Sequence, residues 1–127
     1  MNDYKRIKKD LSYSKIRSID VYHIHQKSMC WLEQSLLEST AAKNIVITHH
    51  APSLQSIPKQ YQNDPVTATY ASNLESFILE HQPLYCIHGH IHTPIQYNIG
   101  NTQIVCNPNG YIDDKDNGFE RELIIEI

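Results

Sequence analysis

The sequence predicts an α/β domain whose last part is an antiparallel meander. Two short runs rich in β-branched and apolar residues, 44–48 (NIVIT) and 84–87 (LYCI), have the composition of buried strands. Each run is preceded by a segment with apolar side chains at helical spacing, residues 21–40 and 67–80. After Pro94 the pattern changes to short strands separated by turn residues. The expected order is therefore helix, strand, helix, strand and a meander.

The first expected helix spans residues 21–40, with Ser18 or Asp20 as its cap. Its expected apolar face consists of Met29, Leu32 and Leu36, widened by Trp31 and Leu37. The strand at residues 44–48 is an almost continuous apolar run, which predicts burial on both faces.

A proline-containing surface loop is expected at residues 55–65, and Asp64-Pro65 would then begin the helix at 67–80. His81 would end that helix, where a cation suits the helix dipole. The second strand runs into Gly89, which would permit a sharp turn.

The meander is expected to begin with a hairpin. Residues 95–99 and 103–106 would be its strands, and Gly100-Asn101 would form the turn between them. Residues 122–127 (ELIIEI) predict a closing strand.

Length and composition indicate one soluble domain covering residues 1–127, in which 40% of residues are hydrophobic. A net charge of −3 argues against general nucleic-acid binding. No apolar stretch predicts a membrane span or a signal peptide, so a cytoplasmic location is expected. Cys30, Cys86 and Cys106 have no CxxC spacing and are expected to be buried thiols in a reducing compartment.

Five of the eight histidines follow the two buried strands, as His49-His50 and as His88, His90 and His92. The carboxyl ends of strands in an open α/β sheet lie at one edge, so the two clusters are expected to converge. Imidazole is a common ligand of transition metals, and three imidazoles would hold one ion. We interpret His88 as structural. A second ion would need carboxylates as well.

Three segments resemble the C-terminal motifs of the calcineurin-like metallophosphoesterases: THHAPS at 48–53, GHIH at 89–92 and NPNGY at 107–111. The WLEQSL helix and the terminal FERELIIEI also fit, so the resemblance covers most of the chain. It implies the C-terminal half of a four-layer α-β-β-α fold, a partial double β-sandwich flanked by helices. It also implies hydrolysis of phosphate esters at a site with two divalent transition metal ions, Mn, Fe, Zn or Ni.

The resemblance assigns His49 as a ligand of one metal, with His50 as its less favoured substitute. His90 and His92 would be the other histidine ligands, one on each metal, and Gly89 would allow the tight turn between the motifs. NPNGY would be mainly a structural turn, although Asn109 stands where the family pattern suggests a basic residue.

The sequence departs from the family in lacking its N-terminal motifs: Asp-x-His, the Gly-Asp with the bridging aspartate, and Gly-Asn-His. Two cations about 3.5–4 Å apart need a shared anion. We therefore expect an incomplete domain with little or no activity alone, either a truncation or one half of a split protein. In the split case a separate chain would supply the missing half.

Two other functions remain open. The alternating histidines from His88 to His92 suit a histidine-triad nucleotide hydrolase or transferase, although Gly89, Thr93 and Pro94 break that pattern. The chain could also be a non-catalytic metal-binding or interaction module, and a co-purifying partner with the missing aspartates would argue for the split enzyme instead.

Overall fold

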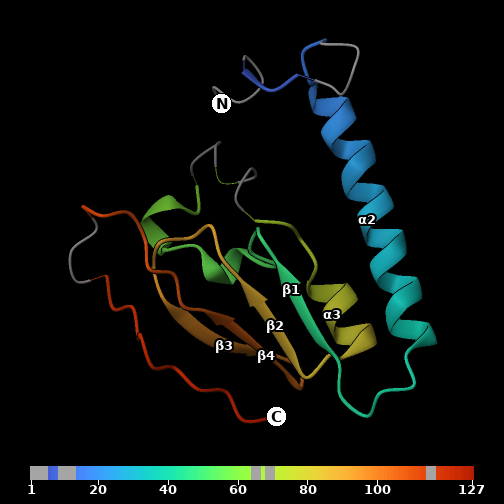
Figure 1. The fold of residues 1–127 in the computed structure, drawn as a ribbon, viewed down its shortest axis with the longest axis vertical. Coiled ribbons are helices and arrows are strands. Elements are labelled where there is room, and N and C mark those ends of the chain that lie inside the picture. The colour runs from blue at the N-terminus through green and yellow to red at the C-terminus, as the bar shows by residue number, and fades with distance from the viewer. Residues whose placement is uncertain (1–5, 9–13, 64–66, 68–70, 114–116) are drawn as a thin grey trace. The chain divides into compact units, whose positions relative to one another are not determined.

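Four strands form one mixed sheet in the computed structural model, in the order β1-β2-β4-β3 (Figure 1). The structure describes residues 6–8, 14–63, 67, 71–113 and 117–127. The chain divides into two compact units, Met1–Ser39 and Thr40–Ile127. No helix among these described residues is long and apolar enough to cross a membrane.

The first unit contains helix α2 (Ser18–Glu38), which begins three residues before the expected start. Its N-cap is Arg17, and not Ser18 or Asp20, because the Arg17 backbone N–H donates to the Asp20 carboxylate over 2.9 Å. No residue of α2 is buried.

The expected apolar face of α2 is correct only in part. Met29, Leu32 and Leu36 are half-buried, whereas Trp31 and Leu37 are 69% and 70% exposed. The helical period places Trp31 and Leu37 beside the apolar stripe, outside its centre.

The second unit is built around the sheet. Strands β1 (Ile45–Thr48), β2 (Tyr85–His88) and β4 (Thr102–Cys106) are parallel, and β3 (Ile95–Ile99) is antiparallel to β4. All four agree with the expected strands to within one residue. The α/β class with an antiparallel last part is therefore confirmed.

Strand β1 lies at the edge of the sheet and is not buried on both faces, so that expectation was wrong. Val46 is 7% exposed, whereas Ile47 on the other face is 76% exposed. Period-two alternation separates the two side chains, and only the Val46 side meets the core of this unit.

Helix α3 (Glu75–His81) is shorter than the helix expected at 67–80. The backbone N–H groups of Ser72 and Leu74 donate to the carbonyls of Ala51 and Pro52, each over 2.8 Å. Those bonds hold residues 71–74 beside the loop after β1, so this segment cannot join the helix. The expected cap at 64–65 lies outside the described residues.

The hairpin between β3 and β4 is confirmed. Gly100 has a φ of +58°, and a Cβ added there would lie 2.9 Å from the Leu79 side chain of α3. The backbone angle favours glycine at this turn, and a larger residue would also displace the end of the Leu79 side chain.

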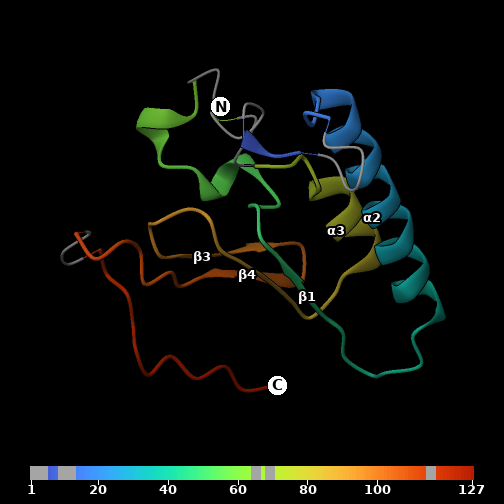
Figure 2. The ribbon, with the colours of Figure 1, turned by 45° about the horizontal axis from the view of Figure 1, so that its top comes forward.

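The expected closing strand at 122–127 is absent, although these residues are described. Asn107 instead holds this end of the chain, because its side chain pairs with both the N–H and the carbonyl of Glu120. Tyr85 donates its hydroxyl to the Glu126 carbonyl. Figure 2 shows this terminal segment on the opposite side of the sheet from the two short 3-10 helices.

The loop expected at 55–65 contains those two helices, η1 (Leu54–Ser56) and η2 (Lys59–Tyr61), and is not wholly a surface segment. Ile57 packs in a small core with Ala51, Ile91 and Cys106. Cys86 and Cys106 are buried as expected, but Cys30 on α2 is exposed. The loops that follow β1 and β2 therefore share one apolar core at the carboxyl edge of the sheet.

Candidate metal centre

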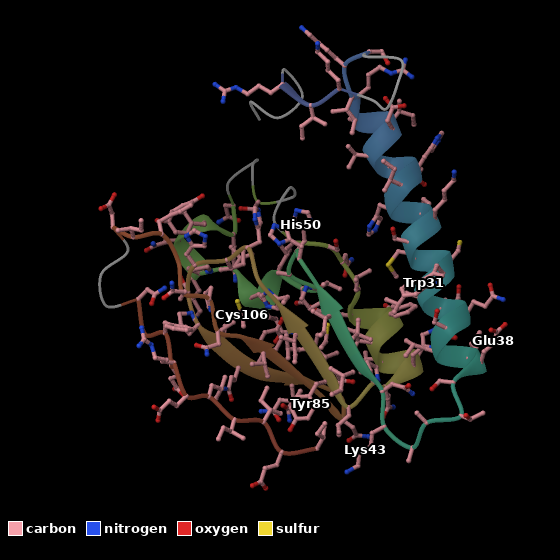
Figure 3. All side chains as sticks on the ribbon, in the orientation of Figure 1. Trp31, Glu38, Lys43, His50, Tyr85 and Cys106 are labelled. Carbon is pink, nitrogen blue, oxygen red and sulfur yellow. The ribbon has the colours of Figure 1, made fainter. Side chains whose placement is uncertain are left out.

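The two histidine clusters meet because β1 and β2 are parallel neighbours that end together. Thr48 and His88 are register partners in the last pair of the ladder. Beyond them, the Gly89 N–H donates to the His49 carbonyl over 3.2 Å. In Figure 3 His50 lies at this end of the sheet and Tyr85 at the other.

Three imidazole rings form a nearly equilateral triangle at this edge. The ring centroids are 5.1 Å apart for His49 and His50, 4.8 Å for His49 and His90, and 4.9 Å for His50 and His90. We call these three residues the histidine triangle. His49 and His50 are exposed, and His90 is half-buried.

His92 lies beside the triangle. Its ring centroid is 4.4 Å from that of Tyr111, in an edge-to-face arrangement. The charge of His92 is one of those that lower the pKa of His90. The residues brought into ring contact are therefore His49, His50 and His90, whereas the sequence interpretation set His92 above His50.

The turn between the motifs is made by His90. His90 has a φ of +64°, in the left-handed region, whereas Gly89 has no positive φ. A Cβ on Gly89 would meet only the His49 carbonyl, at the ordinary distance of 3.9 Å. The expectation that Gly89 permits the sharp turn was therefore wrong. Histidine is among the side chains that adopt this backbone region more readily, and such positions are common at functional sites.

Burial lowers the pKa of His90, and the neighbouring charges of His50, His49 and His92 lower it further. The charges that shift this pKa all belong to imidazoles, which repel one another when protonated. The neutral ring is the form that binds a metal, so the cluster favours the ligand form of His90.

The spacing of the triangle fits one ion. Zinc–nitrogen bonds are about 2.0–2.1 Å long, so imidazoles on one tetrahedral ion have ring centroids about 5 Å apart. Within the described ranges, however, no group of three or more His, Cys, Asp or Glu side chains is placed so that it could hold a metal ion.

A buried, hydrogen-bonded group of side chains includes His88, two residues before His90, and the sequence interpretation missed it. The Ser56 Oγ is 2.9 Å from His88 Nε2 and 2.7 Å from the Tyr97 hydroxyl. Burial lowers the pKa of His88, while its bond to the Gly89 carbonyl acts in the opposite direction. The position of His88, last in an apolar strand and on the same face as Cys86, was the available signal. The structural interpretation of His88 agrees with its 4% exposure.

The loop after β1 is fixed by Ser53. Its hydroxyl accepts from the Gln55 N–H at the start of η1 and donates to the Glu75 carboxylate over 2.5 Å. The bond from Ser53, followed by a second from the Gln55 side chain, lowers the pKa of Glu75.

The backbone of the NPNGY segment is irregular, and the turn that follows it lies at residues 112–113. The interpretation of NPNGY as a structural turn therefore stays a prediction. Gly110 has a φ of +72°, and the Pro108 carbonyl accepts a bond from Asn117. Tyr111 is 73% exposed, and its ring contacts that of His92.

Comparisons with protein-family models, with curated proteins and with solved structures found no match to this chain. The resemblance to calcineurin-like phosphoesterases therefore depends on the three sequence motifs alone.

Proposed function

We propose that this chain is the histidine-bearing part of a metal-dependent phosphoesterase. The observation that carries the proposal is the histidine triangle, whose centroid separations of 4.8–5.1 Å are close to the spacing of about 5 Å expected for imidazoles around one ion. The phosphate-ester chemistry comes from the motifs at 48–53, 89–92 and 107–111.

His49 and His90 are the two proposed ligands that the motifs assign and whose rings also belong to the triangle. In the isolated chain His50 is the third ligand, because its ring completes the triangle. In a complete centre with two ions His92 would serve the second ion, and Tyr111 would hold its ring at the rim of the site. Imidazole ligands accept Mn, Fe, Zn or Ni.

Metal ions in such centres activate water and stabilise negative charge on the transferring phosphoryl group. This chain contributes the imidazoles and sets their positions through two adjacent parallel strands. A centre with two ions also needs carboxylates, which the recognised motifs do not supply.

A second chain with the missing aspartates would complete the site and the double sandwich. The edge position of β1 supports this, because its outer edge faces no strand among the described residues and Ile47 is 76% exposed there. The isolated chain would then bind one ion and hydrolyse phosphate esters poorly. A non-catalytic metal-binding module would bind the same ion but gain no activity from such a partner.

The histidine-triad alternative receives no support from the arrangement of the rings. His88 is 4% exposed and bonded to Ser56, so it does not share one accessible face with His90 and His92.

Cobalt(II) titration tests the proposed ligands, because the visible spectrum of cobalt reports its coordination. We expect one ion per chain and a low-coordinate nitrogen spectrum. His49→Ala and His90→Ala should each weaken binding by more than about 100-fold, beyond the usual effect of supporting residues. His50→Ala should weaken binding more than His92→Ala does.

His25→Ala is the matched control, because His25 is an exposed histidine on α2 in the other unit. It should leave the cobalt affinity unchanged. Equal affinities for wild type, His49→Ala and His90→Ala would refute the centre.

A further inference from the structure

The buried, hydrogen-bonded chain of Tyr97, Ser56 and His88 joins three elements of the second unit. Tyr97 belongs to β3, Ser56 ends η1 and His88 ends β2. Ser56 is 1% exposed and His88 is 4% exposed. The Ser56 hydroxyl lies between the other two groups, at 2.7 Å from Tyr97 and 2.9 Å from His88.

The direction of each hydrogen bond follows from one fixed acceptor. The Gly89 carbonyl, 3.0 Å from His88 Nδ1, can only accept, so Nδ1 carries a hydrogen. In the neutral ring Nε2 is then an acceptor, and Ser56 donates its one hydrogen to it. Tyr97 must therefore donate to Ser56. Every hydrogen in the chain is assigned, which is what buried polar groups require.

The hydrogen-bonded chain of Tyr97, Ser56 and His88 connects both loops that carry the triangle. Ser56 lies six residues after His50 on the loop from β1, and His88 lies two residues before His90 on the loop from β2. The same two loops are joined by the bond from the Gly89 N–H to the His49 carbonyl. Movement of Ser56 relative to His88 would therefore change the spacing of the rings.

A nucleophilic role for the Ser56–His88 pair does not fit the structure. With 1% of its surface exposed, Ser56 offers no approach for a substrate. The pair acts on position and not on a reacting atom.

We infer that Tyr97, Ser56 and His88 are positioning residues that hold the two loops in register, fix the spacing of the histidine triangle and thereby set its affinity for a metal ion. The effect on affinity rests on the proposed metal centre, whereas the effect on the loops does not. Supporting residues that orient metal-binding histidines commonly change affinity by about 10–100-fold.

Two conservative substitutions test the inference. Tyr97→Phe removes one hydroxyl and keeps the ring, and Ser56→Ala removes the hydroxyl at the centre of the chain. The matched control is Tyr85→Phe, because the Tyr85 hydroxyl bonds the Glu126 carbonyl at the opposite end of the sheet (Figure 3).

The first readout needs no metal: hydrogen exchange of the Gly89 amide, corrected for the global stability of each variant. We expect exchange at least about tenfold faster in Tyr97→Phe and Ser56→Ala, and unchanged in Tyr85→Phe, because local opening is independent of global unfolding. An unchanged Gly89 rate in the first two variants would overturn the inference.

The second readout is cobalt(II) affinity. Tyr97→Phe and Ser56→Ala should each bind about tenfold more weakly, and the double variant no more weakly than Ser56→Ala, since both substitutions break one chain. Affinities equal to that of wild type would refute the role in metal binding. If wild type binds no cobalt while the Gly89 rates respond as expected, the proposed metal centre fails and the positioning of the loops stands.

Discussion

Replacing Ser53 with alanine should destabilise the loop that carries His49 and His50, in a manner that depends on pH. Ser53 is 1% exposed, and its hydroxyl makes two bonds: it accepts from the Gln55 N–H and donates to the Glu75 carboxylate. Loss of a cap costs about 1 kcal/mol, and loss of a bond to a charged group costs about 1.5 kcal/mol or more when buried. Because the Glu75 carboxylate is partly in solvent, we expect about 2 kcal/mol in total at neutral pH.

The sign of the pH effect follows from Glu75. Its pKa is lowered in the folded state, first by the Ser53 bond and then by the Gln55 bond. A lowered carboxylate pKa contributes stability that is present above the unfolded pKa and is lost as pH falls through the folded pKa. The cost of Ser53→Ala should therefore fall toward about 1 kcal/mol, the cap alone, near pH 3.

Urea unfolding followed by circular dichroism, at about pH 7 and about pH 3, measures both values. Glu75→Gln should remove the pH dependence of the Ser53→Ala effect. Glu80→Gln removes a charge from an exposed position on the same helix, and should leave that dependence in place. A Ser53→Ala cost that is zero, or equal at both pH values, would refute this account of the loop.

Two further predictions concern the glycines at positions 89 and 100 and the three cysteines. Gly100→Ala should cost at least about 1 kcal/mol, because the position has a φ of +58° and a new Cβ would lie 2.9 Å from a leucine of α3. Gly89→Ala should cost clearly less stability, because its Cβ would meet only a carbonyl oxygen at 3.9 Å. Thermal unfolding of the two variants measures the difference, and equal losses of stability would contradict this prediction. Iodoacetamide at mildly alkaline pH should modify the exposed Cys30 and spare Cys86 and Cys106, since burial raises the pKa of both thiols to about 11. Mass spectrometry showing fast modification of either buried thiol in the folded chain would be the contrary result.

The sheet was predictable from local sequence because its strands are short apolar runs bounded by turn residues. The length of α3 was not, since residues 71–74 have helical periodicity but Ser72 and Leu74 donate their N–H groups to the loop after β1. The terminal ELIIEI has strand composition, yet this end of the chain is held by side chains: Asn107 makes two bonds to Glu120, and Tyr85 makes one to Glu126. In both cases distant partners decided the outcome, and distant partners leave no periodic signal.

The candidate site, like the fold, could be predicted from the sequence only in part. Its location could be predicted because adjacent parallel strands end at one edge, which brings His49 near His90. The sequence pattern does not indicate the left-handed backbone at His90 or the contact between the His50 and His90 rings. Ser56 and Tyr97 are 41 residues apart in the chain and carry no motif, so only the fold relates them.

The metal content of the purified, untagged chain, measured by elemental mass spectrometry after equilibration with zinc, tests the central claim most directly. The account predicts one ion per chain for wild type and none for His90→Ala, with the fold of the variant retained. No ion in wild type would contradict the metal centre. Two ions would contradict the proposal that this chain supplies only part of the centre, because the chain would then complete the centre with ligands of its own.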